Sequence, residues 1–202
     1  MPQLSAESLP PIVLAFAASD PTGGAGIQAD IMTLASMGCH PLSVITAITV
    51  QDTSGVEDIL PIDADWIADQ ARALLEDIPV AAFKLGMLGS VEAIAAIAEI
   101  IADYPDIPLI LDPVLASGRG DQFANEDMID AMMELLLPQT TIITPNSPRL
   151  AAWRRTRTAT MTPVWTNAPG ASSTPAASLS SSPALTKTPS RSSTPSTAKT
   201  AW

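Results

Sequence analysis

Short apolar runs alternate with amphipathic segments over the first 148 residues of the chain. A continuous apolar run such as Ile12–Ala17 is typical of a strand buried on both faces. Similar runs predict strands over residues 42–50, 80–85, 108–111 and 140–144, and residues 56–62 suit a short extra strand. Helical periodicity predicts helices over residues 25–38, 63–76 and 125–137, and one that begins after residue 90. Strands alternating with helices predict an α/β fold whose parallel sheet is covered on both faces.

Polar residues and one glycine mark where these helices begin and end. Asp63 or Asp65, Ser90 and Asn125 can each cap a helix N-terminus, and Gly38 ends the first helix. The periodicity predicts three inward faces: Ile27, Ile31, Leu34 and Ala35; Trp66, Ile67, Ala71, Leu74 and Leu75; and Ile94, Ile97, Ala98 and Ile101. We expect these side chains to pack against the sheet.

The glycine-containing stretch from Ala18 to Asp30 joins the first strand to the first helix. Its glycines allow positive φ angles and a close approach of a ligand to the backbone. Free N–H groups at the helix start would favour a polar or anionic ligand group. Polar or glycine residues follow the other strands too, namely Gln51, Gly86-Met87, Asp112 and Asn146. Because ligands bind at the carboxyl ends of parallel strands, this edge predicts a small-molecule site.

The charge distribution divides the chain at residue 148. Residues 1–148 carry all 21 acidic residues and three basic ones, a formal net charge of −18, whereas residues 149–202 carry seven basic residues and no acidic one. The acidic first part argues against nucleic acid as a partner, because phosphate binding needs Lys and Arg. No apolar run is long enough to span a membrane, and the single cysteine suits the reducing cytoplasm. We therefore expect a cytoplasmic domain over residues 1–148 and a basic, disordered tail over residues 149–202.

Several motifs, in order, resemble those of the hydroxymethylpyrimidine and phosphomethylpyrimidine kinases of thiamine biosynthesis. The first is Ser19-Asp20-Pro21-Thr22-Gly23-Gly24-Ala25-Gly26-Ile27-Gln28-Ala29-Asp30. The others are Val44-Ile45-Thr46-Ala47, Gln51-Asp52-Thr53-Ser54-Gly55-Val56, Lys84-Leu85-Gly86-Met87-Leu88, Leu111-Asp112-Pro113-Val114, Ser117-Gly118, Leu136-Leu137-Pro138 and Ile143-Thr144-Pro145-Asn146. The resemblance covers about residues 10–148.

The resemblance implies a ribokinase-like three-layer α/β/α sandwich with a mainly parallel sheet. It implies transfer of phosphate from ATP, with Mg²⁺, to 4-amino-5-hydroxymethyl-2-methylpyrimidine and then to its monophosphate. By similarity, Gln51 pairs with the aminopyrimidine edge, and Met87 and Val114 line the faces of the ring. Asp30 would lie near the pocket, and the backbone at Gly23 would approach the substrate. A homodimer would be usual for such a kinase.

Each of these residues also has a plainer interpretation. Asp30 would then only solvate its helix, Met87 and Val114 would be core residues, and Gln51 would be a loop side chain in water. Lys84 suits either a structural ion pair with Asp112 or a direct contact to phosphate. His40 follows the first helix and is expected to be a surface or helix-terminus histidine, not a catalytic one.

The chain departs from the family pattern after the fifth strand. The family has Asn-x-x-Glu where this chain has Asn146-Ser147-Pro148-Arg149, so a cation stands in place of an anion near the expected Mg²⁺. The Gly-Thr-Gly-Cys anion hole, with its catalytic cysteine, is absent from the 202 residues, as is the adenine site. We therefore assign no catalytic residue and leave the metal ligands unassigned, and we expect the C-terminal part of the fold to be missing.

A shifted reading frame would account for the tail. With codons chosen for Pro148-Arg149-Leu150, one restored base gives Pro-Glu-Ala and returns the expected glutamate, and the segment 156–163 becomes an acidic loop. The coding DNA decides the matter. The alternatives are a natural Ser/Thr/Pro-rich interaction arm that can be phosphorylated, or a linker of an exported protein.

Three functional hypotheses remain open from the sequence. The first is a kinase by descent whose 202-residue chain has no turnover. The second is a pyrimidine-binding remnant without kinase activity, and the third is a pyridoxal-type kinase of the same fold. An exposed sheet edge would also make aggregation of the isolated chain a real outcome.

Overall fold

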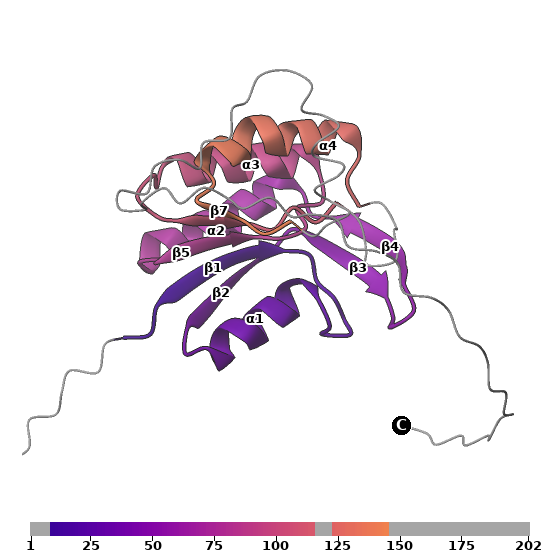
Figure 1. The fold of residues 1–202 in the computed structure, drawn as a ribbon, viewed down its shortest axis with the longest axis horizontal. Coiled ribbons are helices and arrows are strands. Elements are labelled where there is room, and N and C mark those ends of the chain that lie inside the picture. Colours follow the sequence, from indigo (N-terminus) through magenta and orange to yellow (C-terminus); the bar gives the residue numbers. More distant parts are fainter. Residues whose placement is uncertain (1–8, 116–122, 146–202) are drawn as a thin grey trace, which may run out of the picture. The chain divides into compact units, whose positions relative to one another are not determined.

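The structure, a computed structural model, describes residues 9–115 and 123–145, which all belong to the compact unit of residues 1–160. Figure 1 shows a central sheet with helices on both of its faces. The predicted boundary at residue 148, the polar loop at residues 116–121, Asn146 and the basic tail all lie outside the described residues. The three-layer α/β/α arrangement predicted from the sequence is confirmed.

The main sheet has five strands in the order β2-β1-β5-β6-β7, and every neighbouring pair is parallel. The strands are β1 (Ile12–Ala17), β2 (His40–Ile45), β5 (Ala82–Leu85), β6 (Leu109–Leu111) and β7 (Ile142–Ile143). Parallel pairing brings the carboxyl ends of all five strands to one edge, as the alternation of strands and helices predicted. The predicted strands at 80–85, 108–111 and 140–144 are each shorter in the structure.

The prediction of one strand over residues 42–50 is wrong. The chain leaves the main sheet after β2, and β3 (Ala47–Gln51) pairs antiparallel with β4 (Val56–Pro61) in a separate two-stranded sheet. Thr46 is buried at the break, where its N–H donates to the Ala17 carbonyl and its own carbonyl accepts from Ile62 N–H. Because both backbone groups of Thr46 bond to other segments, the apolar run bends without leaving a polar group unpaired.

Three helices cover one face of the sheet and begin at the predicted caps. They are α2 (Ala64–Asp77), α3 (Val91–Ala102) and α4 (Glu126–Ala131). The side chains of Asp63, Ser90 and Asn125 accept hydrogen bonds from N–H groups in the first turns of these helices. Such caps each stabilise a helix by about 1 kcal/mol.

The helix predicted to run from Asn125 to Leu137 is interrupted. After α4 the chain forms a π-helical turn, η1 (Met132–Leu136), and a 3₁₀ turn, η2 (Leu137–Gln139). Pro138 has no N–H group with which to continue an α-helix. The Thr140 hydroxyl donates a hydrogen bond to the Leu136 carbonyl instead. Met128, Met132 and Leu136 of this segment are still buried in the core, whereas Leu135 is 39% exposed.

The other face is covered, among the described residues, by α1 (Gly26–Ser36). Ile27 and Ile31 pack against Ala15 and Ala17 of β1, but Ala35, which was predicted to face inward, is exposed. Gly38 ends the helix as predicted, with φ at +78°, while Gly38 N–H donates to Ala35 and Cys39 N–H to Leu34. This pair of bonds is the Schellman arrangement, which needs a residue at positive φ.

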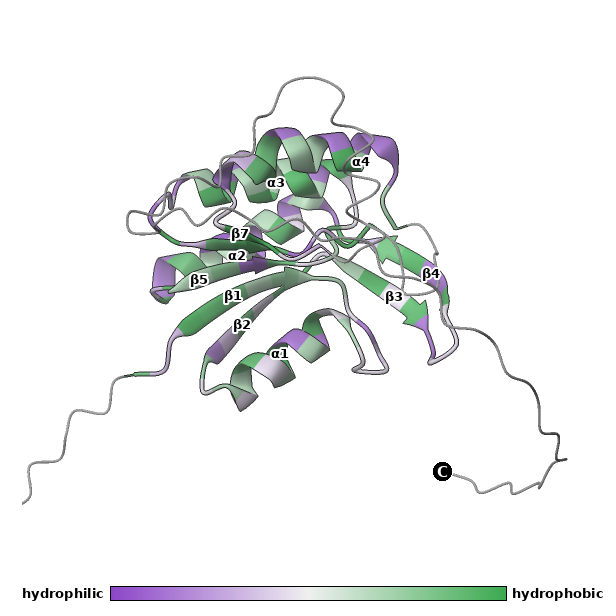
Figure 2. Ribbon diagram, in the orientation of Figure 1, coloured by the Kyte–Doolittle hydropathy of each residue, from purple (hydrophilic) through white to green (hydrophobic). Residues whose placement is uncertain are grey.

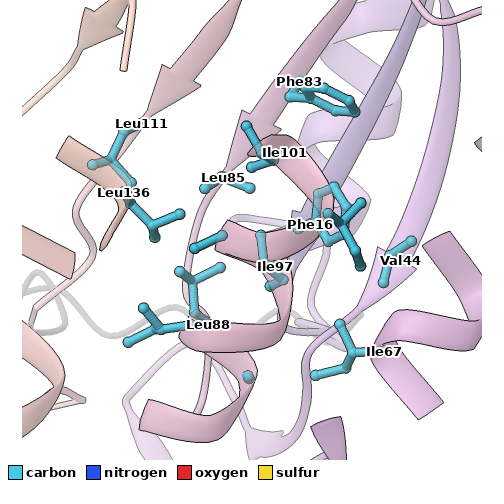
Figure 3. Packing of buried hydrophobic residues seen from close by; sticks show 14 of the residues in the cluster. Phe16, Val44, Ile67, Phe83, Leu85, Leu88, Ile97, Ile101, Leu111 and Leu136 are labelled. Carbon is cyan, nitrogen blue, oxygen red and sulfur yellow. The ribbon is translucent and has the colours of Figure 1, made fainter. Parts of the chain in front are cut away.

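The core lies between the sheet and the helices α2 and α3 (Figure 3). Its largest fully buried side chains include Phe16, Phe83, Ile67, Ile97, Leu111 and Leu136. Trp66, which the periodicity placed inward, is 68% exposed. Figure 2 shows β1 green over most of its length and the start of α4 purple, where Glu126 and Asp127 occupy the first turn.

Candidate functional site

A pocket of about 250 Å³ opens at the carboxyl edge of the main sheet. Its walls come from the segments after β1, β5 and β6, from the first turns of α1, and from the end of β3. Gln51, Asp30, Met87 and Val114, four of the five predicted binding residues, line it. Pockets for drug-sized ligands hold about 300–1,000 Å³, so this one suits a smaller molecule.

The fifth predicted residue, Gly23, lies outside the pocket lining, which Gly26 reaches instead. Gly26 has φ at +59°, and a Cβ atom there would collide with the carbonyl oxygen of Ala18. The sequence offered three glycines in this turn and no means of telling which one faces a ligand. The structure shows that the close approach at Gly26 is between two parts of the backbone.

The turn before α1 uses its N–H groups internally. The Asp20 carboxylate accepts from Thr22 N–H and Ala25 N–H, both at 2.8 Å, and the Asp20 carbonyl accepts from Gly23 N–H. Gly24 N–H donates to the Thr22 hydroxyl at 3.2 Å. The expectation of free N–H groups for a ligand anion is therefore wrong for residues 22–25, because the anion at this turn is the protein's own Asp20.

Asp20 is a buried charge, with 3% of its surface exposed. Burial raises the pKa of its carboxyl group, but hydrogen bonds from Thr22, Ala25 and the Gln51 side chain outweigh burial, so the pKa lies below its usual 3.8. Hydrogen bonds to a carboxylate favour its charged form. Asp20 is therefore an anion at neutral pH and holds the turn in shape.

Gln51 is the last residue of β3, and the loop predicted over residues 51–55 begins after it. Its side-chain oxygen lies 3.0 Å from the Thr49 hydroxyl, which also donates to the Ser19 carbonyl at 2.7 Å. The next residues form a tight turn in which the Asp52 carboxylate accepts from Ser54 N–H and Gly55 N–H. This turn ends the strand and leaves the Gln51 amide at the pocket wall.

Two of the lining residues, Lys84 and Asp30, form an ion pair. Lys84 on β5 donates to Asp30 on α1 at 2.7 and 2.8 Å, and the two side chains are 23% and 18% exposed. The sequence suggested Asp112 as the partner of Lys84, and the structure pairs Lys84 with Asp30. This pair could not be predicted from the sequence, because the two residues are 54 positions apart and meet only in the folded protein.

Apolar side chains form another part of the pocket lining. Met87 is buried in a small cluster with Ala18 and Ala47, and Val114 and Phe123 pack against this cluster. Phe123, Thr49 and Ser19 line the pocket although sequence reasoning did not select them. Only Thr49 had a signal, since its alternation with Gln51 along one strand places both side chains on one face.

The described residues include no group of three or more His, Cys, Asp or Glu side chains that could hold a metal ion. Asp30, Asp112 and Lys84 bring charge to the pocket but do not form such a set. Within residues 9–115 and 123–145 there is no helix with the length and apolar character needed to cross a membrane.

Comparison with known proteins decides the family. The family model described as phosphomethylpyrimidine kinase matches residues 20–168. The chain belongs to the phosphomethylpyrimidine kinase family. A hydroxymethylpyrimidine/phosphomethylpyrimidine kinase of Streptomyces coelicolor is 40% identical over 142 residues, which are 70% of this chain and 52% of that protein. The enzyme of the same name from Haemophilus influenzae is 43% identical over 140 residues, 69% of this chain and 52% of that protein.

Solved structures of phosphomethylpyrimidine kinases and pyridoxal kinases share the fold. The crystal structure of the phosphomethylpyrimidine kinase of Clostridium difficile 630 has a TM-score of 0.66 and 39% identity, and covers 70% of this chain and 62% of that one. The pyridoxal kinase of Staphylococcus aureus in complex with pyridoxal has a TM-score of 0.62 and 32% identity, over 69% and 51% of the two chains. The chain spans about half the length of the curated relatives it matches.

Proposed function

We propose that the pocket binds 4-amino-5-hydroxymethyl-2-methylpyrimidine and its monophosphate, as the substrate site of an ATP-dependent kinase of thiamine biosynthesis. The observation that carries this proposal is a small pocket lined by the Gln51 amide together with the apolar side chains of Met87 and Val114. An amide can donate and accept along one edge, which matches an amino group beside a ring nitrogen. Apolar walls suit the two flat faces of such a ring.

The charges in the pocket support a polar group at one end of the ligand. Lys84 and Asp30 line the pocket as an ion pair, so the pocket there offers both a cation and a carboxylate. A hydroxyl group can accept from the first and donate to the second. We place the hydroxymethyl group of the substrate toward this pair, and its monophosphate toward Lys84.

ATP and Mg²⁺ enter as part of the same proposal. The family is one of kinases, and the pyridoxal kinase of Staphylococcus aureus has been solved with AMP-PCP and pyridoxal. ATP would supply the phosphoryl group, and Mg²⁺ would offset the charge of its phosphates. No described residue is assigned to either. The 202 residues contain no Gly-Thr-Gly-Cys, so we expect a polypeptide of this sequence to bind the pyrimidine without turning it over.

Calorimetry on the 202-residue chain tests the proposal. We expect saturable binding of 4-amino-5-hydroxymethyl-2-methylpyrimidine, and a loss of at least roughly tenfold in affinity for Gln51→Leu, which removes the amide at similar volume. Gln139→Leu is the matched control. Gln139 lies on η2, just before β7, which is the outermost strand of the main sheet on the side away from β2. Absence of binding to the folded chain would sink the proposal. Phosphorylation of the pyrimidine in the presence of ATP would instead show that the chain is an active kinase.

Pyridoxal is the second candidate, since pyridoxal kinases share the fold at about a third sequence identity. Its ring carries an aldehyde group where the proposed substrate has an amino group, and a hydroxyl group at the position of the neighbouring ring nitrogen. Tighter binding of pyridoxal than of the aminopyrimidine in the same calorimeter would favour this alternative.

The cellular setting is also proposed. A single cysteine, Cys39, is free among the described residues and suits the reducing cytoplasm. A homodimer is proposed from the family resemblance alone. Sedimentation of the purified chain would decide between monomer and dimer.

A further inference from the structure

Thr46 lies between β2 and β3 and makes hydrogen bonds to three other segments of the chain. Its N–H donates to the Ala17 carbonyl at 3.1 Å, and its carbonyl accepts from Ile62 N–H at 2.9 Å. Its hydroxyl donates to the Met87 carbonyl at 2.5 Å, and the residue is fully buried. A buried carbonyl that loses its donor is costly. The Thr46 hydroxyl therefore ties the segment after β5 to the start of the two-stranded sheet.

The segment after β5 passes close to Thr46 at a second point. Gly89 has φ at +86°, and a Cβ atom there would lie 3.0 Å from the Thr46 carbonyl oxygen. The same atom would lie 3.5 Å from Cβ of Ala47, which begins β3, and 3.6 Å from Cβ of Pro61, which ends β4. Glycine permits this approach because it adopts positive φ and carries no side chain. Contacts at both Met87 and Gly89 thus hold this segment against the two-stranded sheet.

Met87 connects this arrangement to the pocket. It is 8% exposed, packs with Ala18 and Ala47, and lines the pocket together with Gln51 at the end of β3. A methionine side chain has three rotatable bonds and adapts readily to its surroundings. The hydrogen bond to the Met87 carbonyl fixes the peptide group that follows Met87, so the backbone from which this adaptable side chain extends cannot turn freely.

We propose that Thr46 is a positioning residue for ligand binding. Through the Met87 carbonyl, its hydroxyl keeps the Met87 side chain at a set distance from the strand that carries Gln51, so that one flat ring meets both groups. A preorganised pocket binds more tightly, because less freedom is lost when the ligand arrives. The identity of the ring rests on the proposed function, whereas the link between Thr46 and Met87 does not.

The methionine methyl signals in the NMR spectrum of the 202-residue chain test the positioning without a ligand. Thr46→Val removes the hydroxyl at nearly the same volume, and we expect it to shift or broaden the Met87 methyl signal. Met87→Leu identifies that signal by its loss. The methyl signals of Met128 and Met132, which lie in the main core, should stay in place. An unmoved Met87 signal, or equal shifts of all three, would overturn the proposal.

Thr140→Val is the matched control. The Thr140 hydroxyl donates to the Leu136 carbonyl at 2.8 Å, so this variant breaks the same kind of bond at a residue outside the pocket lining. It should leave the Met87 signal unchanged, and Thr46→Ser, which keeps the hydroxyl, should do so too. Movement of the Met87 signal in Thr140→Val would trace the effect to general loosening. Movement in Thr46→Ser would trace it to lost packing, and either result overturns the proposal.

Thr46→Cys replaces Thr46→Val if the valine variant does not fold. A thiol is a weak donor, and cysteine differs from serine in one atom. A Met87 signal that moves in Thr46→Cys and not in Thr46→Ser assigns the effect to the hydrogen bond. Equal Met87 signals in these two variants overturn the proposal.

Calorimetry with 4-amino-5-hydroxymethyl-2-methylpyrimidine measures the consequence for binding. We expect Thr46→Val to weaken binding roughly tenfold, while Thr46→Ser and Thr140→Val keep the wild-type affinity. Wild-type affinity in Thr46→Val would overturn the role in binding. A wild-type chain that does not bind the pyrimidine, but whose Met87 signal moves in Thr46→Val, would refute the proposed ligand and still support the positioning of Met87 by Thr46.

Discussion

Lys84 donates to both carboxylate oxygens of Asp30, at 2.8 and 2.7 Å, and so joins β5 to α1 in the lining of the pocket. Lys84 is the one lysine in the first 148 residues, a segment with 21 acidic side chains. The pair therefore has a structural role besides the binding role that we propose for it. It ties the only described helix on this face of the sheet to a central strand.

Breaking this ion pair should destabilise the fold. Lys84→Met leaves the partly buried Asp30 carboxylate without its cation, and we expect the free energy of unfolding to fall by about 1–3 kcal/mol. Asp30→Asn should cost less, since a neutral amide can still accept from Lys84. Urea unfolding measures both, and the double variant gives the coupling energy. Strictly additive losses would contradict a direct interaction.

The stabilising effect of Asp20 should depend on pH. Its pKa in the folded chain is below the usual 3.8, so its contribution is complete above that value and is lost as the pH falls through the lower folded pKa. The difference in unfolding free energy between wild type and Asp20→Asn should be constant from about pH 5 to 8 and shrink below about pH 4. The other ionisable groups lining the pocket, Asp30, Lys84 and Asp112, are common to both proteins. A difference that persists unchanged to about pH 2 would show that the charge of Asp20 contributes nothing.

Two glycines at positive φ should differ in their tolerance of alanine. At Gly26 a Cβ would collide with the Ala18 carbonyl, whereas at Gly38 it would meet no atom within 4 Å. We expect Gly26→Ala to cost about 2 kcal/mol or more and Gly38→Ala about 1 kcal/mol, the strain of positive φ alone. Thermal unfolding of the two variants measures the difference. Equal losses would rule out the clash at Gly26.

Two isoleucines provide a test of where the core lies. Ile97 on α3 is fully buried, and Ile48 on β3 is 47% exposed. We expect Ile97→Ala to lower the free energy of unfolding by about 2–5 kcal/mol, and Ile48→Ala by less than about 1 kcal/mol. Chemical denaturation of the two variants, made side by side, provides the comparison. A comparable loss at Ile48 would mean that the two-stranded sheet contributes to the main core.

Local signals predicted most of the fold because they act over a few residues. The apolar run at Ile12–Ala17 became β1 without change, and Asp63, Ser90 and Asn125 cap their helices. Hydrophobicity alone did not show the break at Thr46, because an apolar run looks the same whether it stays in one sheet or crosses to another. It also placed Trp66 inward, but none of the elements that the structure describes covers this side chain, which is 68% exposed.

The candidate site was predicted in outline for a different reason. Topology brings strand ends together, so Gln51, Met87 and Val114 could be expected near one another before their contacts were known. The pairing of Lys84 with Asp30 and the burial of Asp20 depend on packing between distant segments, and no local pattern carries that information. The glycine turn suggested a site for an anion of the ligand. The anion bound there is the carboxylate of Asp20, a residue of the same motif.

The break at Thr46 separates the residues that form the main core from the two-stranded sheet that carries Gln51. Gln51 sits at the end of a two-stranded arm, β3 and β4, whose buried apolar side chain, Ala47, belongs to the small cluster with Met87 and not to the main core. Substitutions on that arm can alter the group that we propose to contact the ligand, while Phe16, Ile97 and their neighbours still form the core. A change in which substrate ring the pocket prefers would then need no compensating substitution in the core. Related kinases of this fold could diverge in substrate through substitutions in the two-stranded arm alone.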